Sequence, residues 1–288
     1  MRNAHRTGTA LALVALTSTL AAGCGRPALL EGVRARALAA ALHIDFTKAT
    51  DAANLAVMAD TDDASESAAR EARTATEAAQ RDAGELKTVL LEQGYAEEST
   101  ELQQFSIRFD EMRKLDAEIL PLAVENSNLK AQRLSFDEGQ RAVDDLIAAV
   151  DAAAHAPGGE AALAASRCVI AVLQIQTLQA RHIAESSDEK MGAIEQQMER
   201  DESSAREQLT RLTALSGPAA APHLRAARVA LDTFMDDNRT IIRLSRRNTN
   251  VRSLALSLGR KRVVIAECET HLAAIDAALS ARETRAVR

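Results

Sequence analysis

The sequence predicts an all-α protein: an elongated antiparallel up-down-up-down four-helix bundle built from a duplicated helical hairpin. The first observation is composition, because 47% of the 288 residues are hydrophobic but only 2% are aromatic, with 12 Gly and 5 Pro. Sheets depend on β-branched and aromatic residues and on frequent turns, so this composition favours helix. The second observation is apolar spacing of three and four, and the third is an internal repeat.

The N-terminal residues are typical of a targeting segment. Arg2 and Arg6 precede an apolar run over 10–22, which is too short to span roughly 30 Å of hydrocarbon. The run ends in Leu-Ala-Ala-Gly-Cys24, which resembles the lipobox of bacterial lipoproteins. The resemblance implies cleavage before Cys24 and acylation of that residue, which would anchor the chain in a membrane. We therefore expect a signal peptide over 1–23, lipid attachment at Cys24 and a linker over 24–34; the alternative is a secreted protein with a chance cysteine.

Breaks in the helical pattern divide the rest of the chain. They fall at Gly94, at Pro157-Gly158-Gly159 and at Gly217-Pro218. Helices of about 55–60 residues would be roughly 85 Å long, and short breaks make neighbours antiparallel. The expected bundle covers 35–284, with helices near 35–92, 99–154, 160–215 and 223–284.

Each predicted helix has a face suited to packing. The first is lined mainly by alanine, which lets helix axes approach closely while each residue buries little area. The second and fourth carry larger residues at helical spacing. Their stripes include Leu102, Phe105, Met112 and Ile119 in the second helix, and Phe234, Ile241, Leu244 and Ile265 in the fourth.

The second half of the chain repeats the first. The segment Asn126-Ser-Asn128-Leu aligns with Asn248-Thr-Asn250-Val at an offset of 122. Segments on either side align at 125, namely an acidic one at 59–63 with 184–188 and an alanine-rich one at 148–153 with 273–278. The repeated units are predicted to be hairpins at 35–155 and 160–284. A single hairpin cannot bury its own apolar face, so each copy needs the other.

Several residues resemble a known sensory family. They are the run Phe-Asp-Glu-Met-Arg-Lys-Leu-Asp-Ala-Glu-Ile-Leu over 109–120, then Leu122-Ala123, Asn128-Leu-Lys-Ala131 and Leu134-Ser135. They are similar to the later helices of the four-helix-bundle sensory module of methyl-accepting chemotaxis receptors. The resemblance implies a module that senses small molecules or partner proteins outside the cytoplasm. The output modules of that family are not recognisable in this sequence, so we expect an accessory input subunit that acts through a membrane receptor or another envelope protein.

A polar layer is predicted at the middle of the bundle. Asp62, Asn126, Ser187 and Asn248 each lie near the midpoint of one predicted helix, at core positions. Buried polar groups cost roughly 1–3 kcal/mol each when unpaired, so they should bond to one another or to water. The layer can fix helix register, as buried Asn does in coiled coils, or it can form a small polar ligand pocket or hinge.

The two remaining cysteines, Cys168 and Cys268, are expected at similar heights on the third and fourth helices. Outside the cytoplasm such a pair can form a disulfide, and the alternative is two buried free thiols. We expect no metal and no cofactor, because no ligand or catalytic motif has the required spacing. The net charge of −6, without a basic patch, argues against nucleic acid as a partner.

The functional expectation is therefore an extracytoplasmic, lipid-anchored sensory or binding protein that is not an enzyme. Its expected partners are the membrane, an envelope protein and a small-molecule ligand. The alternative is a structural rod or spacer of the envelope that binds no ligand. Bundles host many unrelated roles, so the fold alone does not separate the two.

Overall fold

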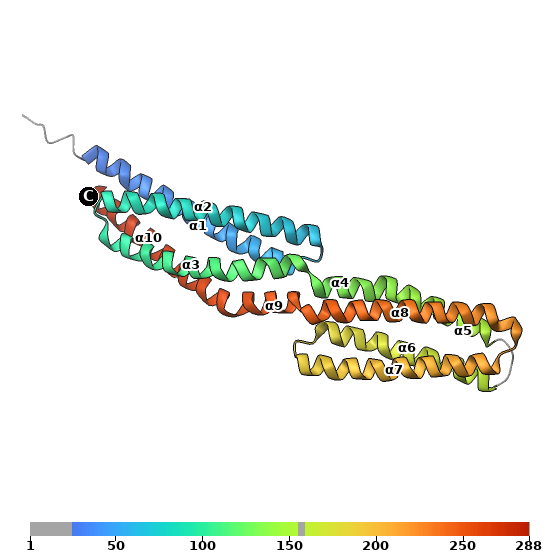
Figure 1. The fold of residues 1–288 in the computed structure, drawn as a ribbon. Coiled ribbons are helices and arrows are strands. Elements are labelled where there is room, and N and C mark those ends of the chain that lie inside the picture. The colour runs from blue at the N-terminus through green and yellow to red at the C-terminus, as the bar shows by residue number, and fades with distance from the viewer. Residues whose placement is uncertain (1–24, 155–158, 288) are drawn as a thin grey trace, which may run out of the picture.

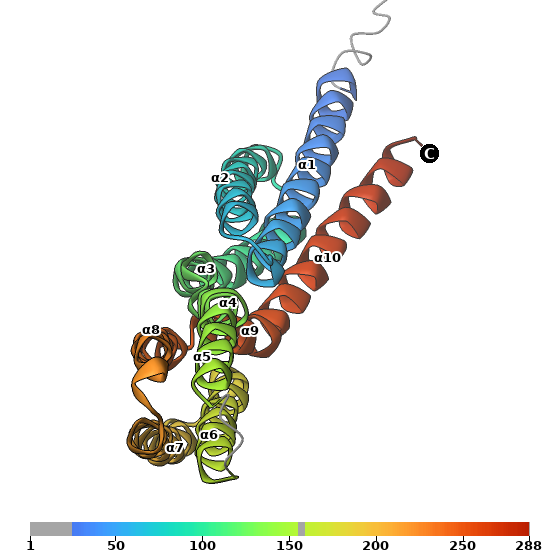
Figure 2. The same ribbon diagram turned by 90° about the vertical axis from the view of Figure 1, so that its right-hand side faces the viewer.

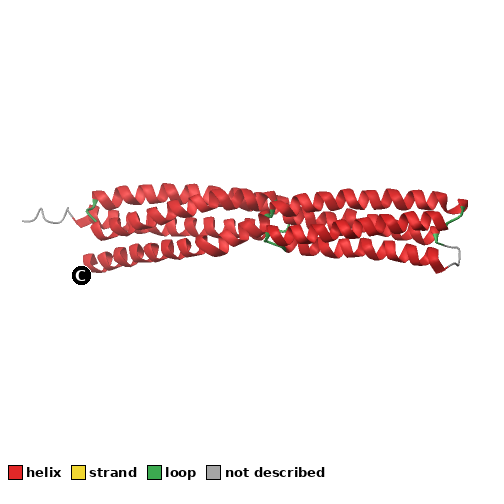
Figure 3. Ribbon diagram, turned by 60° about the horizontal axis from the view of Figure 1, so that its bottom comes forward, coloured by secondary structure: helices red, strands yellow, loops and turns green. Residues whose placement is uncertain are grey.

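The computed structural model describes residues 25–154 and 159–287, and these residues confirm an all-α protein. Short loops join the helices, and no strand occurs in the described ranges (Figure 3). The molecule is elongated, with two groups of helices placed end to end (Figure 1). The signal peptide expected over 1–23 and the lipidation site expected at Cys24 lie outside the described residues.

The first group of helices, which we call half A, contains the start and the end of the described chain. It consists of α1 (Gly25–Met58), α2 (Asp62–Glu92), α3 (Ala96–Glu125) and α10 (Arg262–Val287). In this half α1 packs on α2, and α10 packs on both α3 and α1. The second group, half B, consists of α5 (Gln140–Ala153), α6 (Gly159–Ala184), α7 (Asp188–Leu215) and α8 (Ala221–Arg247).

A short central joint connects the two halves. It contains α4 (Ser127–Leu134) and α9 (Thr249–Leu256), each followed by one π-helical turn. Those turns, at Ser135–Gly139 and Ser257–Lys261, occupy matching places in the two repeats. A π-helical turn is rare, and its recurrence at the same place supports the duplication that the sequence predicts.

Four continuous helices are not what the chain forms. The first and third predicted helices are each a shorter hairpin, because the chain reverses at 59–61 between α1 and α2 and at 185–187 between α6 and α7. Thr61 Oγ1 accepts a hydrogen bond from the backbone N–H of Ala64 (3.2 Å), and Ser187 Oγ accepts one from Lys190 (3.4 Å). These side chains cap the second helix of each hairpin. The apolar spacing continues across both turns, which is why the pattern predicted one long helix.

The expected linker over 24–34 is also different in the structure. From Gly25 onward this stretch is the first part of α1, continuous with the segment that packs in half A. Within the described residues it is therefore helical and not an extended linker.

The two repeats exchange their last helices. Repeat 1 supplies α1, α2 and α3 to half A but sends α5 to half B, where it packs on α8. Repeat 2 supplies α6, α7 and α8 to half B and returns α10 to half A, beside α1 (Figure 2). Each half is therefore completed by a helix from the other repeat, so neither repeat can bury its apolar face alone.

Each half has its own apolar core. Phe46, Phe105 and Phe109 meet at the centre of half A, with ring centroids 5.3–6.1 Å apart. In half B, Phe234 and Met198 pack with the buried face of α6. Among the described helices, α6 is long and apolar enough to cross a membrane by length and composition. Val172 and Ile175 of this helix are buried in the half B core, but only 39% of its apolar window is buried in the structure.

Candidate functional site

The central joint is built on two asparagines with left-handed backbone conformation. Asn126 ends α3 with φ of 52°, and Asn248 ends α8 with φ of 54°. They are the non-glycine residues of positive φ within the described ranges. Asparagine tolerates this region better than most residues, so it can interrupt a long helix without a loop.

The two interruptions cap each other. The backbone N–H of Ser127 donates to Thr249 Oγ1 (3.0 Å), and that of Thr249 donates to Ser127 Oγ (3.1 Å). One residue further, the N–H of Asn128 donates to Asn250 Oδ1 (3.1 Å), and that of Asn250 donates to Asn128 Oδ1 (3.2 Å). The first amides of a helix have no partner within it, so each new helix obtains its N-terminal acceptors from the other repeat.

The asparagine side chains complete the same network. Asn128 Nδ2 donates to Asn248 Oδ1, and Asn250 Nδ2 donates to Asn126 Oδ1, both at 2.9 Å. Asn126 Nδ2 also donates to Asp62 Oδ1 (3.2 Å). Because these amides and hydroxyls satisfy one another, the layer favours fixed register over a ligand pocket at this level.

The four residues predicted for the polar layer have different roles. Asn126 and Asn248 are buried and join one network, as the repeat indicated. Asp62 lies in the first turn of α2, where it contacts Asn126 and forms an ion pair with Lys130 (3.5 Å). Ser187 is the N-cap of α7 and does not occupy a core position of a continuous helix. The partners that the prediction missed are Ser127, Asn128, Thr249 and Asn250, although the repeated Asn-x-Asn pattern contained the signal.

The predicted disulfide between Cys168 and Cys268 is wrong. Both thiols are free and buried, but Cys168 lies in the core of half B and Cys268 in that of half A. The prediction placed them at one height by counting along continuous helices, and the reversal at 185–187 invalidates that count. Burial raises the pKa of the Cys168 thiol to about 11 and that of Cys268 to about 12. Neither thiol is therefore suited to nucleophilic chemistry near neutral pH.

A second polar cluster connects α6, α7 and α8 inside half B. The ring of His182 is completely buried, with Nδ1 2.6 Å from Ser245 Oγ and Nε2 2.7 Å from Glu195 Oε1. Arg246 binds the same carboxylate through Nε (2.6 Å) and Nη2 (2.9 Å). Ser245 Oγ lies 2.8 Å from the carbonyl oxygen of Ile241 and is buried, so this Ser-His-Glu contact has no access to a substrate.

A buried ion pair occupies the core of half A. Lys261 is completely buried, and its Nζ lies 2.5 Å from Asp116 Oδ1. Burial raises the pKa of the Asp116 carboxyl, and the charge of Lys261 opposes that shift. The matching residues of half B, at the offset of 122, are Gly139 and Asn238, and Asn238 Oδ1 accepts a hydrogen bond from Gln179 instead (2.9 Å). At this level, half A therefore has a buried ion pair and half B has a hydrogen bond between neutral side chains.

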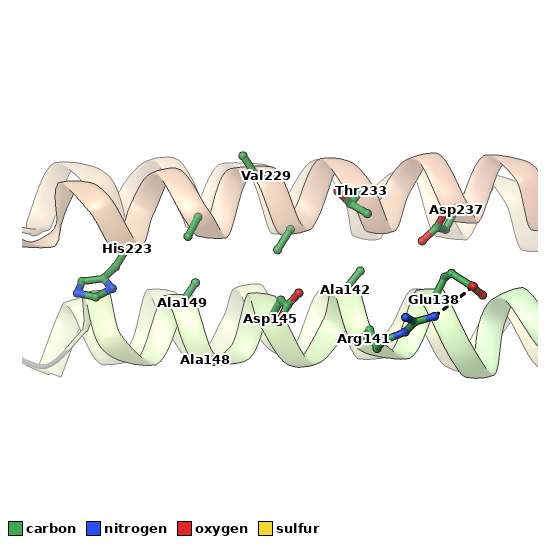
Figure 4. A pocket seen from close by; sticks show the side chains of 12 residues that line it. Glu138, Arg141, Ala142, Asp145, Ala148, Ala149, His223, Val229, Thr233 and Asp237 are labelled. Carbon is green, nitrogen blue, oxygen red and sulfur yellow. Dashed lines mark ion pairs between the residues drawn. The ribbon is translucent and has the colours of Figure 1, made fainter.

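A surface groove lies in half B. It has a volume of about 830 Å³ and runs between α5 and α8 (Figure 4). Its walls carry small residues together with charged ones. The lining residues include Ala142, Asp145, Ala149, Ala226, Ala230 and Asp237.

In half A, two ion pairs and one histidine contact bridge the matching segments. Glu111 on α3 pairs with Arg260 (2.7 Å) in the π-helical turn that precedes α10, and Arg108 on α3 pairs with Glu267 on α10 (3.0 Å). Nδ1 of His271 on α10 lies 2.8 Å from Glu101 Oε2 on α3. The buried positions of α10 and α5 match at the offset of 122, as Cys268 and Leu146 do, and not at the 125 expected from the sequence. At this offset, the half B counterparts are Thr233 and Glu138, Ala230 and Asp145, and His223 and Ala149. None of these counterparts forms an ion pair across α5 and α8 in the described residues, so the groove stays open.

Comparison with protein families, with curated protein sequences and with solved structures finds no match for this chain.

We predict that Thr249→Val destabilises the protein by roughly 1–3 kcal/mol. The substitution keeps the shape of the side chain but leaves the buried N–H of Ser127 without an acceptor. Chemical denaturation followed by circular dichroism measures the change. Thr210→Val is the control, because Thr210 is exposed and bonds only to the carbonyl of Arg206 in its own helix; an equal loss in both variants would contradict reciprocal capping.

We predict that Glu195 stabilises the protein in a pH-dependent way. Its hydrogen bonds with Arg246, and then with His182, lower the pKa of the Glu195 carboxyl in the folded state. A lowered pKa means that the stabilisation is complete above the unfolded pKa of about 4.3 and disappears as pH falls through the folded value. Glu195→Gln should therefore lower the free energy of unfolding at about pH 7, and this loss should shrink progressively as pH falls below about 4.3. Denaturant titration from neutral to acidic pH measures it; Glu199→Gln, at an exposed position on α7, should have little effect across the same range.

We predict that Lys261→Met costs roughly 3–5 kcal/mol, because it leaves the buried Asp116 without its cation. The double variant Lys261→Met with Asp116→Leu should recover most of that loss, since an apolar pair can replace a buried ion pair. Thermal and denaturant unfolding of the three proteins measure both effects. Additive losses in the double variant would show that the two side chains are not coupled.

Proposed function

We propose that this chain is a lipid-anchored binding protein of the bacterial cell envelope. In this proposal half A is a stalk and half B carries the recognition surface. The observation that carries the proposal is the difference between two copies of one structural unit. In half A, Glu111–Arg260, Arg108–Glu267 and Glu101–His271 bridge α3 to α10 and the π-helical turn before it, whereas the matching segments of half B leave a groove of about 830 Å³ open.

The shape of the molecule is consistent with this division of roles. The first described residues of α1 lie at the end of the molecule that is opposite to half B (Figure 1). An acyl anchor at Cys24 would therefore leave half B as the part farthest from the membrane. A recognition surface on that half would be accessible to other envelope proteins.

A sensory role is a narrower form of the same proposal. The resemblance to chemotaxis-receptor sensory modules supports an accessory input subunit, which would pass its bound state to a membrane partner. The alternative is a spacer without a ligand. At the level of Asn126 and Asn248 the hydrogen bonding favours that alternative, because the asparagine side chains there already bond to one another.

The lipid anchor is the first part to test. We predict that the wild-type chain, expressed in a bacterial host, incorporates labelled palmitate and sediments with membranes. Cys24→Ala should abolish the label and prevent cleavage before residue 24, because the thiol is the acylation site. Incorporation into the variant, or a soluble wild-type protein without label, would overturn the proposal. Cys168→Ala is the matched control, since that cysteine is buried and should not affect labelling.

A further inference from the structure

We propose that the groove between α5 and α8 is a docking site for an amphipathic helix of a partner protein, which presents basic side chains to Asp145 and Asp237. This inference rests on the proposed function, in which half B is the recognition half. The spacing, the size and the charge of the groove residues support it.

The groove walls have the spacing of a helix-docking seam. On α8 the lining residues His223, Ala226, Ala230, Thr233 and Asp237 follow intervals of three and four. On the opposite wall, Glu138 of the π-helical turn and Ala142, Asp145 and Ala149 of α5 follow the same pattern. These are the a and d intervals with which helices pack side by side in coiled coils. Over 223–237 the seam is about 20 Å long, which matches about four turns of an incoming helix.

The residues along the seam are small enough to admit another helix. Ala226 and Ala230 stand where half A has Gln104 and Arg108, and Ala149 stands where it has His271. Small side chains let helix axes approach more closely, and methyl groups give an incoming apolar face something to pack on. Val229 adds an apolar contact at the edge, because 66% of its surface is exposed.

The groove also has carboxylates without partners. Asp145 occupies the place of Glu267, but Ala230 has replaced the arginine that Glu267 binds in half A. Oδ2 of Asp237 is inaccessible to solvent and has no hydrogen-bond partner among the described residues. Burial, followed by repulsion from Glu138 and Asp236, raises the pKa of the Asp237 carboxyl. The nearby Arg141 is already paired with Glu138 (3.1 Å).

This charge pattern distinguishes a basic partner from a second copy of the chain. Two copies that met groove to groove would bring Asp145, Asp237 and their symmetry mates together, and like charges at an interface are unfavourable. A helix with lysine or arginine beside its apolar stripe would instead supply the cation that Arg108 supplies in half A.

The test uses two synthetic helical peptides as probes of the purified full chain. Both have about 18 residues with leucine and alanine on one face; one carries lysine beside that face, and the other carries glutamate at the same positions. Fluorescence anisotropy measures binding of each labelled peptide. We expect the basic peptide to bind at least about tenfold more tightly than the acidic one, with an affinity that falls as salt is added.

Charge variants locate the binding. Asp145→Asn and Asp237→Asn should each weaken binding of the basic peptide by about fivefold or more. Asp144→Asn is the matched control, because Asp144 is the neighbouring residue of α5, has the same charge and does not line the groove. Equal binding of the two peptides, no binding of the basic peptide, or equal losses in Asp144→Asn and Asp145→Asn would overturn the proposal.

A groove-filling variant tests the site without depending on charge removal alone. Ala230→Arg recreates in half B the arginine that pairs with Glu267 in half A, so the protein should stay folded while peptide binding is lost. Circular dichroism and thermal unfolding verify folding. Unchanged binding by folded Ala230→Arg would overturn the proposal, as would a wild-type dimer in analytical ultracentrifugation that this variant dissociates. These measurements use purified protein in solution, so their failure is separate from failure of membrane attachment at Cys24.

Discussion

The reciprocal capping at the joint is the constraint on which the rest of the structure depends. Each long helix breaks at a left-handed asparagine, Asn126 or Asn248, and each break exposes backbone amides that require acceptors. Those acceptors are the side chains at the other break, including Ser127 and Thr249. The two breaks must therefore lie at the same level. This condition fixes the register of one broken helix on the other and, through it, the position of both halves.

The exchange of helices makes the two halves interdependent but lets them differ in chemistry. Because α10 completes half A and α5 completes half B, each core contains residues of both repeats. The repeats could then change at matching positions while the joint stayed the same. Lys261 faces Asp116 in half A, whereas the equivalent level of half B has Gly139 and Asn238. The backbone keeps a π-helical turn in both places, so divergence affected the side chains more than the path of the chain.

The sequence predicts this fold where local patterns are unambiguous. Helical spacing and the repeated Asn-x-Asn segment predicted the all-α class, the duplication and the placement of Asn126 and Asn248 in one polar layer. The reversal at 59–61 escaped prediction because alanines continue the spacing through it, and the capping side chain of Thr61 is an ordinary surface residue in sequence. The misplacement of Cys168 followed from that kind of error at the second hairpin. Pairs such as Arg108 with Glu267 could not be predicted, since many acidic residues share the exposed faces.

Comparison of the two repeats shows which residues stabilise the fold in both halves and which residues of half B need another explanation. Half A shows how this pair of helices is closed when only the chain itself is involved: long charged side chains meet across α3 and α10. The same backbone in half B could accept such pairs, yet Ala230 leaves Asp145 unpaired and Asp237 keeps an unsatisfied carboxylate oxygen. A buried carboxylate oxygen without a partner lowers the stability of the free protein. In half A the buried oxygens of Asp116 and Glu267 face the cations of Lys261 and Arg108. Asp237 has no ion pair among the described residues, and an occupant that supplies both an apolar contact and a cation explains this difference most simply.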